Sequence, residues 1–143
     1  MKKIGIVMAV VLMLVSGACS QSNPEEGEPP IGQVLDDAVY LGEYLDSDTK
    51  EAGLEIAKGE DGGYIIQIGI YRLTSLDDGV GELTAEGMKF TATDAAGNPI
   101  GGIITVEGEA AIVTFTDSTW EYLESGTSFS YIKSSDVPNL WDE

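Results

Sequence analysis

The stretch Tyr-Ile-Ile-Gln-Ile-Gly-Ile-Tyr-Arg-Leu, residues 64–73, decides the fold class of this chain. Every second residue from Tyr64 to Ile70 is tyrosine or isoleucine, so these side chains share one face if the segment is a β-strand. The preceding loop, residues 59–63, holds three glycines, which supply the left-handed backbone positions that a hairpin needs. We therefore predict a strand at 64–73, paired through a hairpin with the run before it.

The same pattern of a strand-like run bounded by turn residues extends over residues 38–133. Short apolar or alternating runs are separated by clusters of Gly, Asp, Asn and Ser about every 10 to 14 residues, which is typical of a β-barrel or sandwich. The predicted strands are 39–45, 53–58, 64–73, 80–85, 88–93, 100–106, 110–116 and 127–133. One short helix is predicted near 119–125, because Ser118 and Glu121 fit a capping box and Gly126 suits a helix C-terminus.

Eight short strands with tight connections predict an all-β domain. We expect an antiparallel meander that curls into a closed or nearly closed barrel, because closure removes exposed strand edges. A two-sheet β-sandwich is the alternative. The Tyr40-x-Gly42-x-Tyr44 opening and the meander order resemble the small lipocalin-like barrels of bacterial envelope lipoproteins, although the Gly-x-Trp signature of true lipocalins is absent.

The first nineteen residues have the pattern of an export signal. Met1-Lys2-Lys3 is followed by an apolar run over 4–15 and by Ser16-Gly17-Ala18-Cys19. This segment resembles a bacterial lipoprotein signal peptide with its lipobox, with Ser16 where leucine is usual. The resemblance implies that Cys19 becomes the first residue of the mature chain and carries a lipid on its sulfur. An ordinary secretory signal, which would leave Cys19 as a free thiol, is the alternative.

These patterns divide the chain into four parts. We expect a signal peptide at 1–18, a lipid anchor and disordered acidic linker at 19–37, a barrel domain at 38–133 and a polar tail at 134–143. The predicted location is the cell membrane or outer membrane, reached by export and held by the lipid on Cys19. Trp141 is the exception in the polar tail, and it either folds back onto the barrel or is exposed for a partner.

Charge is the unusual feature of the composition. The chain has 25 acidic and 7 basic residues, and only Lys2 and Lys3 among all of these precede Cys19. The part that follows Cys19 therefore carries a net charge of −20. Such a surface repels nucleic acid and favours cationic partners, or it simply keeps an exported protein soluble.

Missing residue types exclude several classes of chemistry. The chain has no histidine and one cysteine, which excludes an intramolecular disulfide, zinc sites built on His or Cys, and Ser-His or Cys-His nucleophile pairs. Asp46-Ser47-Asp48 and Asp77-Asp78-Gly79 are interpreted as turns rather than as calcium loops. We predict no catalytic activity, no cofactor and no metal.

Two function classes remain: a non-catalytic binding or interaction module of the cell envelope, and an enzyme with a carboxylate-based or metal-based site, which the missing histidine and the single cysteine disfavour. The aromatic residues Tyr40, Tyr44, Phe90, Trp120 and Tyr131 line a ligand cavity if the barrel is open, or form the core if it is filled. We expect the acidic surface to bind a basic protein. The alternatives are a carrier of a small apolar ligand and an inhibitor of a basic wall-degrading enzyme, by resemblance to small barrel lysozyme inhibitors.

Overall fold

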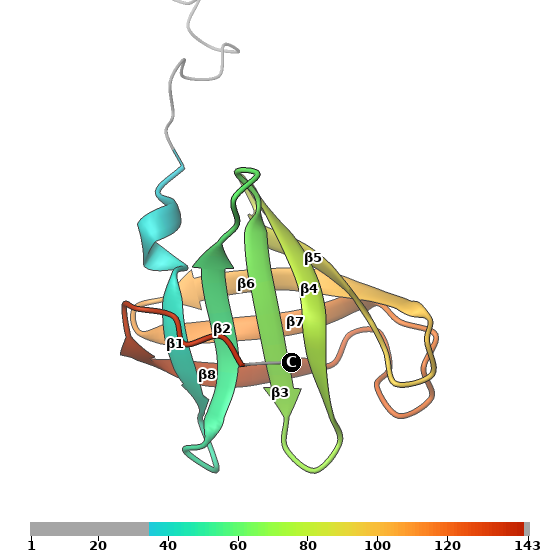
Figure 1. Cartoon of the computed structure of the whole chain (residues 1–143). Helices are drawn as coiled ribbons and strands as arrows, with labels where there is room; N and C mark the ends of the chain where they lie inside the picture. Colours follow the sequence, from blue (N-terminus) through green and yellow to red (C-terminus); the bar gives the residue numbers. More distant parts are fainter. Residues whose placement is uncertain (1–34, 142–143) are drawn as a thin grey trace, which may run out of the picture. The chain divides into compact units, whose positions relative to one another are not determined.

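The computed structural model describes residues 35–141, which form an all-β barrel of eight strands (Figure 1). The elements are η2 (Asp37–Val39), a 3₁₀ helix, and then β1 (Gly42–Asp46), β2 (Ala52–Lys58), β3 (Tyr64–Ile70), β4 (Thr74–Thr84), β5 (Gly87–Thr93), β6 (Pro99–Glu107), β7 (Ala110–Asp117) and β8 (Ser128–Ser135). The η2 turn is the only helical element in this part of the chain.

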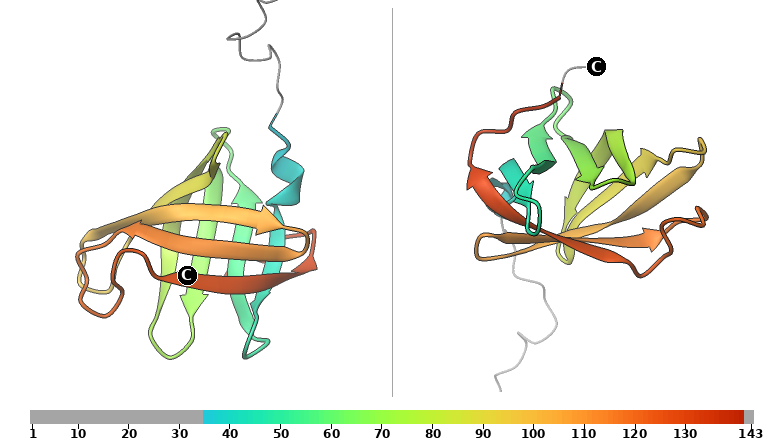
Figure 2. Two further views of the ribbon diagram at one scale, coloured as in Figure 1. Left: turned by 180° about the vertical axis from the view of Figure 1, so that it is seen from behind. Right: turned by 90° about the horizontal axis from the view of Figure 1, so that it is seen from below.

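Each strand pairs antiparallel with the next, and β1 also pairs with β8, so the sheet closes on itself. In Figure 1, β1 to β4 stand side by side at the front, while β6 to β8 run across them behind; Figure 2 shows β6 to β8 from the other side. The predicted meander barrel is confirmed, and the sandwich alternative is wrong.

The interior of the barrel is apolar because alternate residues of each strand point inward. On β2, for example, Leu54 and Ile56 are completely buried. The buried core comprises Tyr44, Leu54, Ile56, Ile66, Ile68, Ile70, Leu76, Met88, Phe90, Ala92, Ile100, Ile104, Ala111, Val113, Phe115, Leu123 and Tyr131. An eight-stranded barrel is just wide enough for such side chains to fill it.

Strand β4 is longer than predicted: it begins at Thr74 rather than at residue 80. The segment interpreted as a turn is instead a β-bulge inside the strand. The register of the β3–β4 pair shifts here, so that Asp77 and Asp78 together lie opposite Gln67. An Asp-Asp-Gly sequence favours turns and bulges alike, and the closed sheet selects the bulge.

The helix predicted near 119–125 is wrong; the segment is a loop of turns between β7 and β8. The Ser118 hydroxyl accepts a hydrogen bond from the N–H of Trp120 (3.2 Å), while the Ser125 hydroxyl accepts one from the N–H of Ser118 (3.0 Å). Gly126 then donates to the carbonyl of Phe115 (2.6 Å), extending the strand pairing. With both ends tied to adjacent strands, the loop has no room for a regular helix.

The ends of the barrel also differ from prediction. Val39, predicted to lie in the first strand, belongs to η2, and β1 begins at Gly42. A Cβ atom on Gly42 would lie 2.1 Å from the carbonyl oxygen of Ser135, where β8 ends, so only glycine permits this contact. The described part of the tail, residues 136–141, crosses the outside of β1 and β2 toward β3 (Figure 1).

The predicted signal peptide, the residue Cys19 and most of the predicted linker lie outside the described residues. Between residues 35 and 141, no helix has the length and apolar character needed to cross a membrane.

Candidate interaction surface

Two of the predicted ligand-lining residues, Tyr44 and Tyr131, are completely buried inside the barrel. The Tyr44 hydroxyl donates to the carbonyl of Tyr40 (2.8 Å), and the Tyr131 hydroxyl donates to the carbonyl of Gly69 (3.0 Å). Burial raises the pKa of both phenols, so both stay neutral donors. Both hydroxyl groups therefore form hydrogen bonds within the barrel itself.

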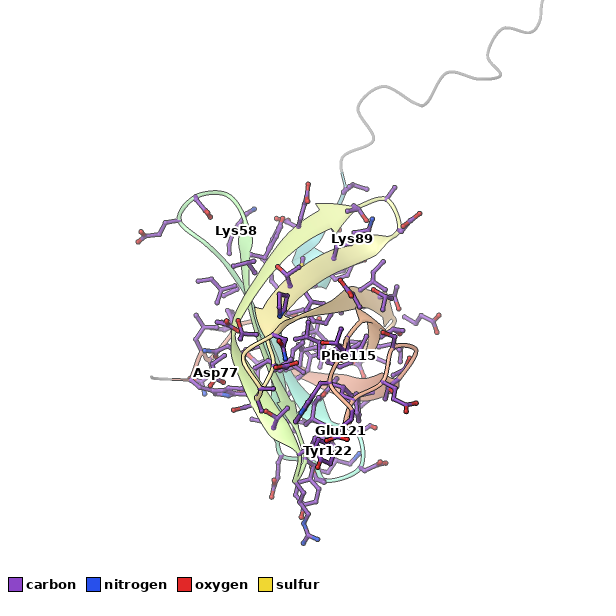
Figure 3. The ribbon with its side chains drawn as sticks, turned by 90° about the vertical axis from the view of Figure 1, so that its right-hand side faces the viewer. Lys58, Asp77, Lys89, Phe115, Glu121 and Tyr122 are labelled. Atoms are coloured by element: carbon purple, nitrogen blue, oxygen red, sulfur yellow. The ribbon has the colours of Figure 1, made fainter. Side chains whose placement is uncertain are left out.

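The remaining predicted residues also contribute to the core or pack against it. Phe90 is buried and meets Phe115 edge to face, with ring centroids 5.5 Å apart, and Figure 3 shows Phe115 within the barrel. Trp120 and Tyr40 are partly buried against the core, and Trp120 also stacks edge to face on the exposed Tyr122 (5.6 Å). The structure thus places Tyr44, Phe90 and Tyr131 in the core, with Tyr40 and Trp120 packed against it.

Three hollows on the outer surface of the barrel meet at Val80 on β4. Val80 is 60% exposed and pairs across the sheet with Ile65 on β3, which is also exposed, and with Thr91 on β5. We call the outward surface of Ile65, Val80 and Thr91, with the hollows beside them, the Val80 face. Figure 3 views β4 and β5 from this side.

Glycines stand on both sides of Val80 along β4. A Cβ atom on Gly79 would lie 2.3 Å from the carbonyl oxygen of Ile66, and one on Gly81 would lie 2.5 Å from the Ile66 Cδ1 atom. Gly79 has no space for a side chain beside the backbone of β3, whereas a side chain at Gly81 would meet only side-chain atoms of Ile66 and Met88. Because successive residues of a strand face opposite sides, both glycines face the barrel interior, and Val80 is an apolar ridge on the outer face with Asp78 before it and Glu82 after it.

Acidic side chains surround this ridge. The largest hollow, about 600 Å³, is lined by Gly59, Glu60, Asp61, Gly63, Tyr64, Ile65, Val80 and Gly81. The second, about 330 Å³, is lined by Val80, Gly81, Glu82, Lys89, Phe90 and Thr91, and the third, about 270 Å³, by Asp78, Val80, Thr91, Ala92, Thr93, Gly97 and Pro99. Four carboxylates and one lysine thus line the hollows around an apolar centre.

The basic residues of the described chain offset little of this charge. Lys58 pairs with Asp37 (2.5 Å) and Lys133 pairs with Asp136 (3.1 Å). Lys89, at the Val80 face, lies 3.9 Å from Glu86, a long contact between two exposed groups. Exposed pairs of this kind contribute little energy, and the face keeps its net negative charge.

The two acidic motifs are structural. Asp46 Oδ1 accepts hydrogen bonds from the N–H groups of Asp48 (2.9 Å) and Thr49 (2.8 Å), which closes the turn between β1 and β2. Asp78 Oδ1, in the β4 bulge, accepts one from the N–H of Thr93 (2.9 Å). Residues 35–141 contain no group of three or more acidic, Cys or His side chains that could hold a metal ion.

Sequence reasoning missed a second polar site, formed by Glu55 on β2 and Gln67 on β3. Both occupy outward positions, yet Glu55 is completely buried and Gln67 is 5% exposed. The tail covers them: Asn139 N–H donates to Glu55 Oε2 (2.7 Å) and Trp141 N–H donates to Gln67 Oε1 (2.7 Å). The available sequence signal was the apolar Leu140-Trp141 pair in an otherwise polar tail.

Comparisons with models of protein families, with curated proteins and with solved structures found no match for this chain.

Proposed function

We propose that this chain is a non-catalytic lipoprotein of the cell envelope, anchored through Cys19, which binds a basic protein at the Val80 face. The observation that carries the proposal is the acidic rim around an exposed apolar ridge. Protein interfaces commonly combine an apolar centre with a polar rim, and the energy concentrates at the centre. In this proposal Val80 and Ile65 supply the centre, while the carboxylates select a cationic partner.

The charge of the whole chain supports the same partner class. A net charge of −20 after Cys19 creates a field that draws cationic proteins toward the barrel and repels nucleic acid. A basic wall-degrading enzyme is one partner with the required charge and location. The lipid on Cys19 would hold the barrel at the membrane, and the acidic linker would let it reach outward.

The carrier alternative draws no support from the packing of the barrel. The side chains proposed to line a cavity are instead buried in the core or packed against it, and two of their hydroxyl groups are bonded to backbone carbonyls. A small apolar ligand would have to displace them. An enzymatic role would have to rest on carboxylates or a bound metal, since histidine is absent from the sequence.

The experiment that tests the proposal is calorimetric titration of the purified Cys19→Ser chain with lysozyme, at low and at physiological salt. A second basic protein of similar size and charge serves as the control for attraction by charge alone. We expect lysozyme to bind more tightly than the control, and its affinity to fall at least about tenfold as salt rises. Equal affinity for both proteins would refute recognition at a specific surface.

A further inference from the structure

The tail segment 136–141 lies on the outer face of β2 and β3, where three residues contact it: Glu55, Gln67 and Gly69. Glu55 and Gln67 are cross-strand partners on β2 and β3, and each accepts one backbone N–H of the tail. The two donors, Asn139 and Trp141, are separated by one residue, so their N–H groups point the same way in an extended chain. The Gln67 side-chain amide also donates to the carbonyl of Trp141 (3.3 Å), so this residue is held at both backbone groups.

The third contact is between Gly69 and the ring of Trp141. Gly69 follows Gln67 by two residues on β3 and therefore faces outward as well. The ring atom Cη2 of Trp141 lies 3.2 Å from the position that a Cβ atom on Gly69 would take. An added Cβ atom would shift the ring by a few tenths of an ångström, and a β-branched side chain would displace it further. Side chains from two strands, rather than a strand edge, thus recognise an extended peptide.

Glu55, which this segment covers, is an ionisable side chain in a buried position. It is completely buried, its Oε2 atom has one donor, and its Oε1 atom has no hydrogen-bond partner. The neighbouring groups offer no positive charge to it. On β1, its cross-strand partner is Glu43, while on β3 it faces the neutral Gln67. In the tail, Asp136 is paired with Lys133 of β8. An ionised carboxylate in these surroundings is costly, and a neutral one much less so.

We propose that the outer face of β2 and β3 is a binding site for an extended peptide with an aromatic residue, that residues 136–141 occupy it as a reversible latch, and that the proton on Glu55 holds the latch closed. When Glu55 ionises, the buried charge and its repulsion from Glu43 favour release of the tail. Release returns Glu55 to water and uncovers Gln67 and Gly69.

The direction of the pH effect follows from the burial of Glu55. Desolvation raises its pKa from an ordinary value of 4.5 to about 7, the hydrogen bond from Asn139 opposes this, and the charge of Glu43 adds to it. A raised pKa means that the closed latch binds the proton more tightly than the open one. The latch is therefore most stable below about pH 4.5 and loses stability as the pH rises to about 7, with no further change above that.

The test is amide hydrogen exchange, followed by NMR on the full chain between pH 4.5 and pH 8. We expect the protection factors of Asn139 and Trp141 to fall at least tenfold, and up to about 80-fold, between pH 4.5 and 7. The protection factor of Ile66, deep in the barrel, should stay constant. Glu55→Gln, which mimics the neutral acid, should keep the tail protected and remove the pH dependence. Glu43→Gln should retain a pH dependence with a midpoint at lower pH.

Two results would overturn the proposal. One is an unchanged pH dependence in Glu55→Gln, which would assign the effect to another group. The other is constant protection of Asn139 and Trp141 over the whole range in the unmodified chain, which would make the tail a fixed part of the fold. Gly69→Val provides an independent check, because it displaces the Trp141 ring without touching Glu55. This variant should lose tail protection at every pH while its circular dichroism stays that of the barrel; full protection would refute the recognition of Trp141.

Discussion

The hydroxyl of Tyr131 on β8 donates to the carbonyl of Gly69 on β3, 62 residues away in the sequence, at 3.0 Å. These strands are not neighbours in the sheet, so the bond joins two walls of the barrel through its interior. The ring also lies against Gly53, where a Cβ atom would be 2.7 Å from it. One side chain thus spans the core and requires a glycine on the strand it crosses.

Tyr131→Phe should lower the free energy of unfolding by about 1 kcal/mol, because a buried hydrogen bond is lost while the ring remains. Urea unfolding followed by tryptophan fluorescence measures this change. The matched control is Tyr122→Phe, since Tyr122 is 65% exposed and its hydroxyl group has no hydrogen bond within the described chain. Equal effects of the two substitutions would contradict a structural role for the Tyr131 hydroxyl.

Gly102→Ala should destabilise the barrel by about 3 kcal/mol, since its Cβ atom would lie 2.0 Å from the backbone carbonyl oxygen of Thr114 on β7. Backbone cannot move aside as a flexible side chain can, so β6 and β7 would have to separate. Gly97→Ala is the control: its added Cβ meets nothing within 4 Å, and its cost, about 1 kcal/mol, comes from a positive φ of 87° alone. Thermal unfolding of both variants distinguishes contact from backbone strain.

Asp46→Asn should make the turn between β1 and β2 less sensitive to acid. Hydrogen bonds from the backbone of Thr49 and Asp48 lower the pKa of Asp46, so the stability it supplies is present above its ordinary value of 3.8 and is lost as the pH falls through the lowered value. Asparagine keeps an acceptor oxygen without a charge. Urea unfolding at pH 7 and pH 3 should show a smaller loss for the variant than for the unmodified chain, and an equal loss would exclude this cause.

The period-two pattern was sufficient to predict the strands and their order because it records which side chains enter the core. Tyr64 to Ile70 alternate as predicted, and β3 spans those residues. The pattern failed where the backbone conformation depends on a neighbouring strand. Asp77-Asp78-Gly79 is a bulge only because Gln67 lies opposite it, and the Ser118–Gly126 loop is non-helical because β7 and β8 hold its ends.

The candidate sites were harder to predict, for a related reason. An outward glutamate such as Glu55 is normally solvated, and nothing local to β2 indicates that the chain returns 84 residues later to cover it. Val80 has the pattern of an ordinary strand residue, and nothing local to β4 indicates that hollows adjoin it on the outer face. Each site is formed by side chains from different segments, and the sequence alone does not indicate that these segments meet.

Cys19→Ser should release the protein from membranes. The prediction follows from the lipobox-like Ser16-Gly17-Ala18-Cys19 segment, because the cysteine sulfur would carry the lipid. Cell fractionation and labelling with a fatty-acid analogue measure the two consequences, loss from the membrane fraction and loss of label. If the variant fractionates with membranes as the unmodified protein does, the anchor is not at Cys19.

Two matched pairs of charge reversals distinguish binding at the Val80 face from attraction by the net negative charge of the chain. Glu60→Lys with Glu82→Lys reverses two carboxylates that line the hollows, and Glu107→Lys with Glu109→Lys reverses two exposed ones at the β6–β7 hairpin. Both pairs change the net charge by four, so long-range attraction weakens about equally. Only the first pair changes groups beside the apolar ridge.

We expect the affinity for the basic partner to fall at least about tenfold more in the Glu60/Glu82 variant than in the Glu107/Glu109 variant. Val80→Ser, which leaves every charge in place, should also weaken binding by about tenfold and should act mainly on the dissociation rate, because it removes buried apolar contact. Surface plasmon resonance at two salt concentrations resolves both rates. If the two charge variants lose equal affinity and Val80→Ser loses none, the partner senses only the net charge of the barrel, and the Val80 face is not its binding site.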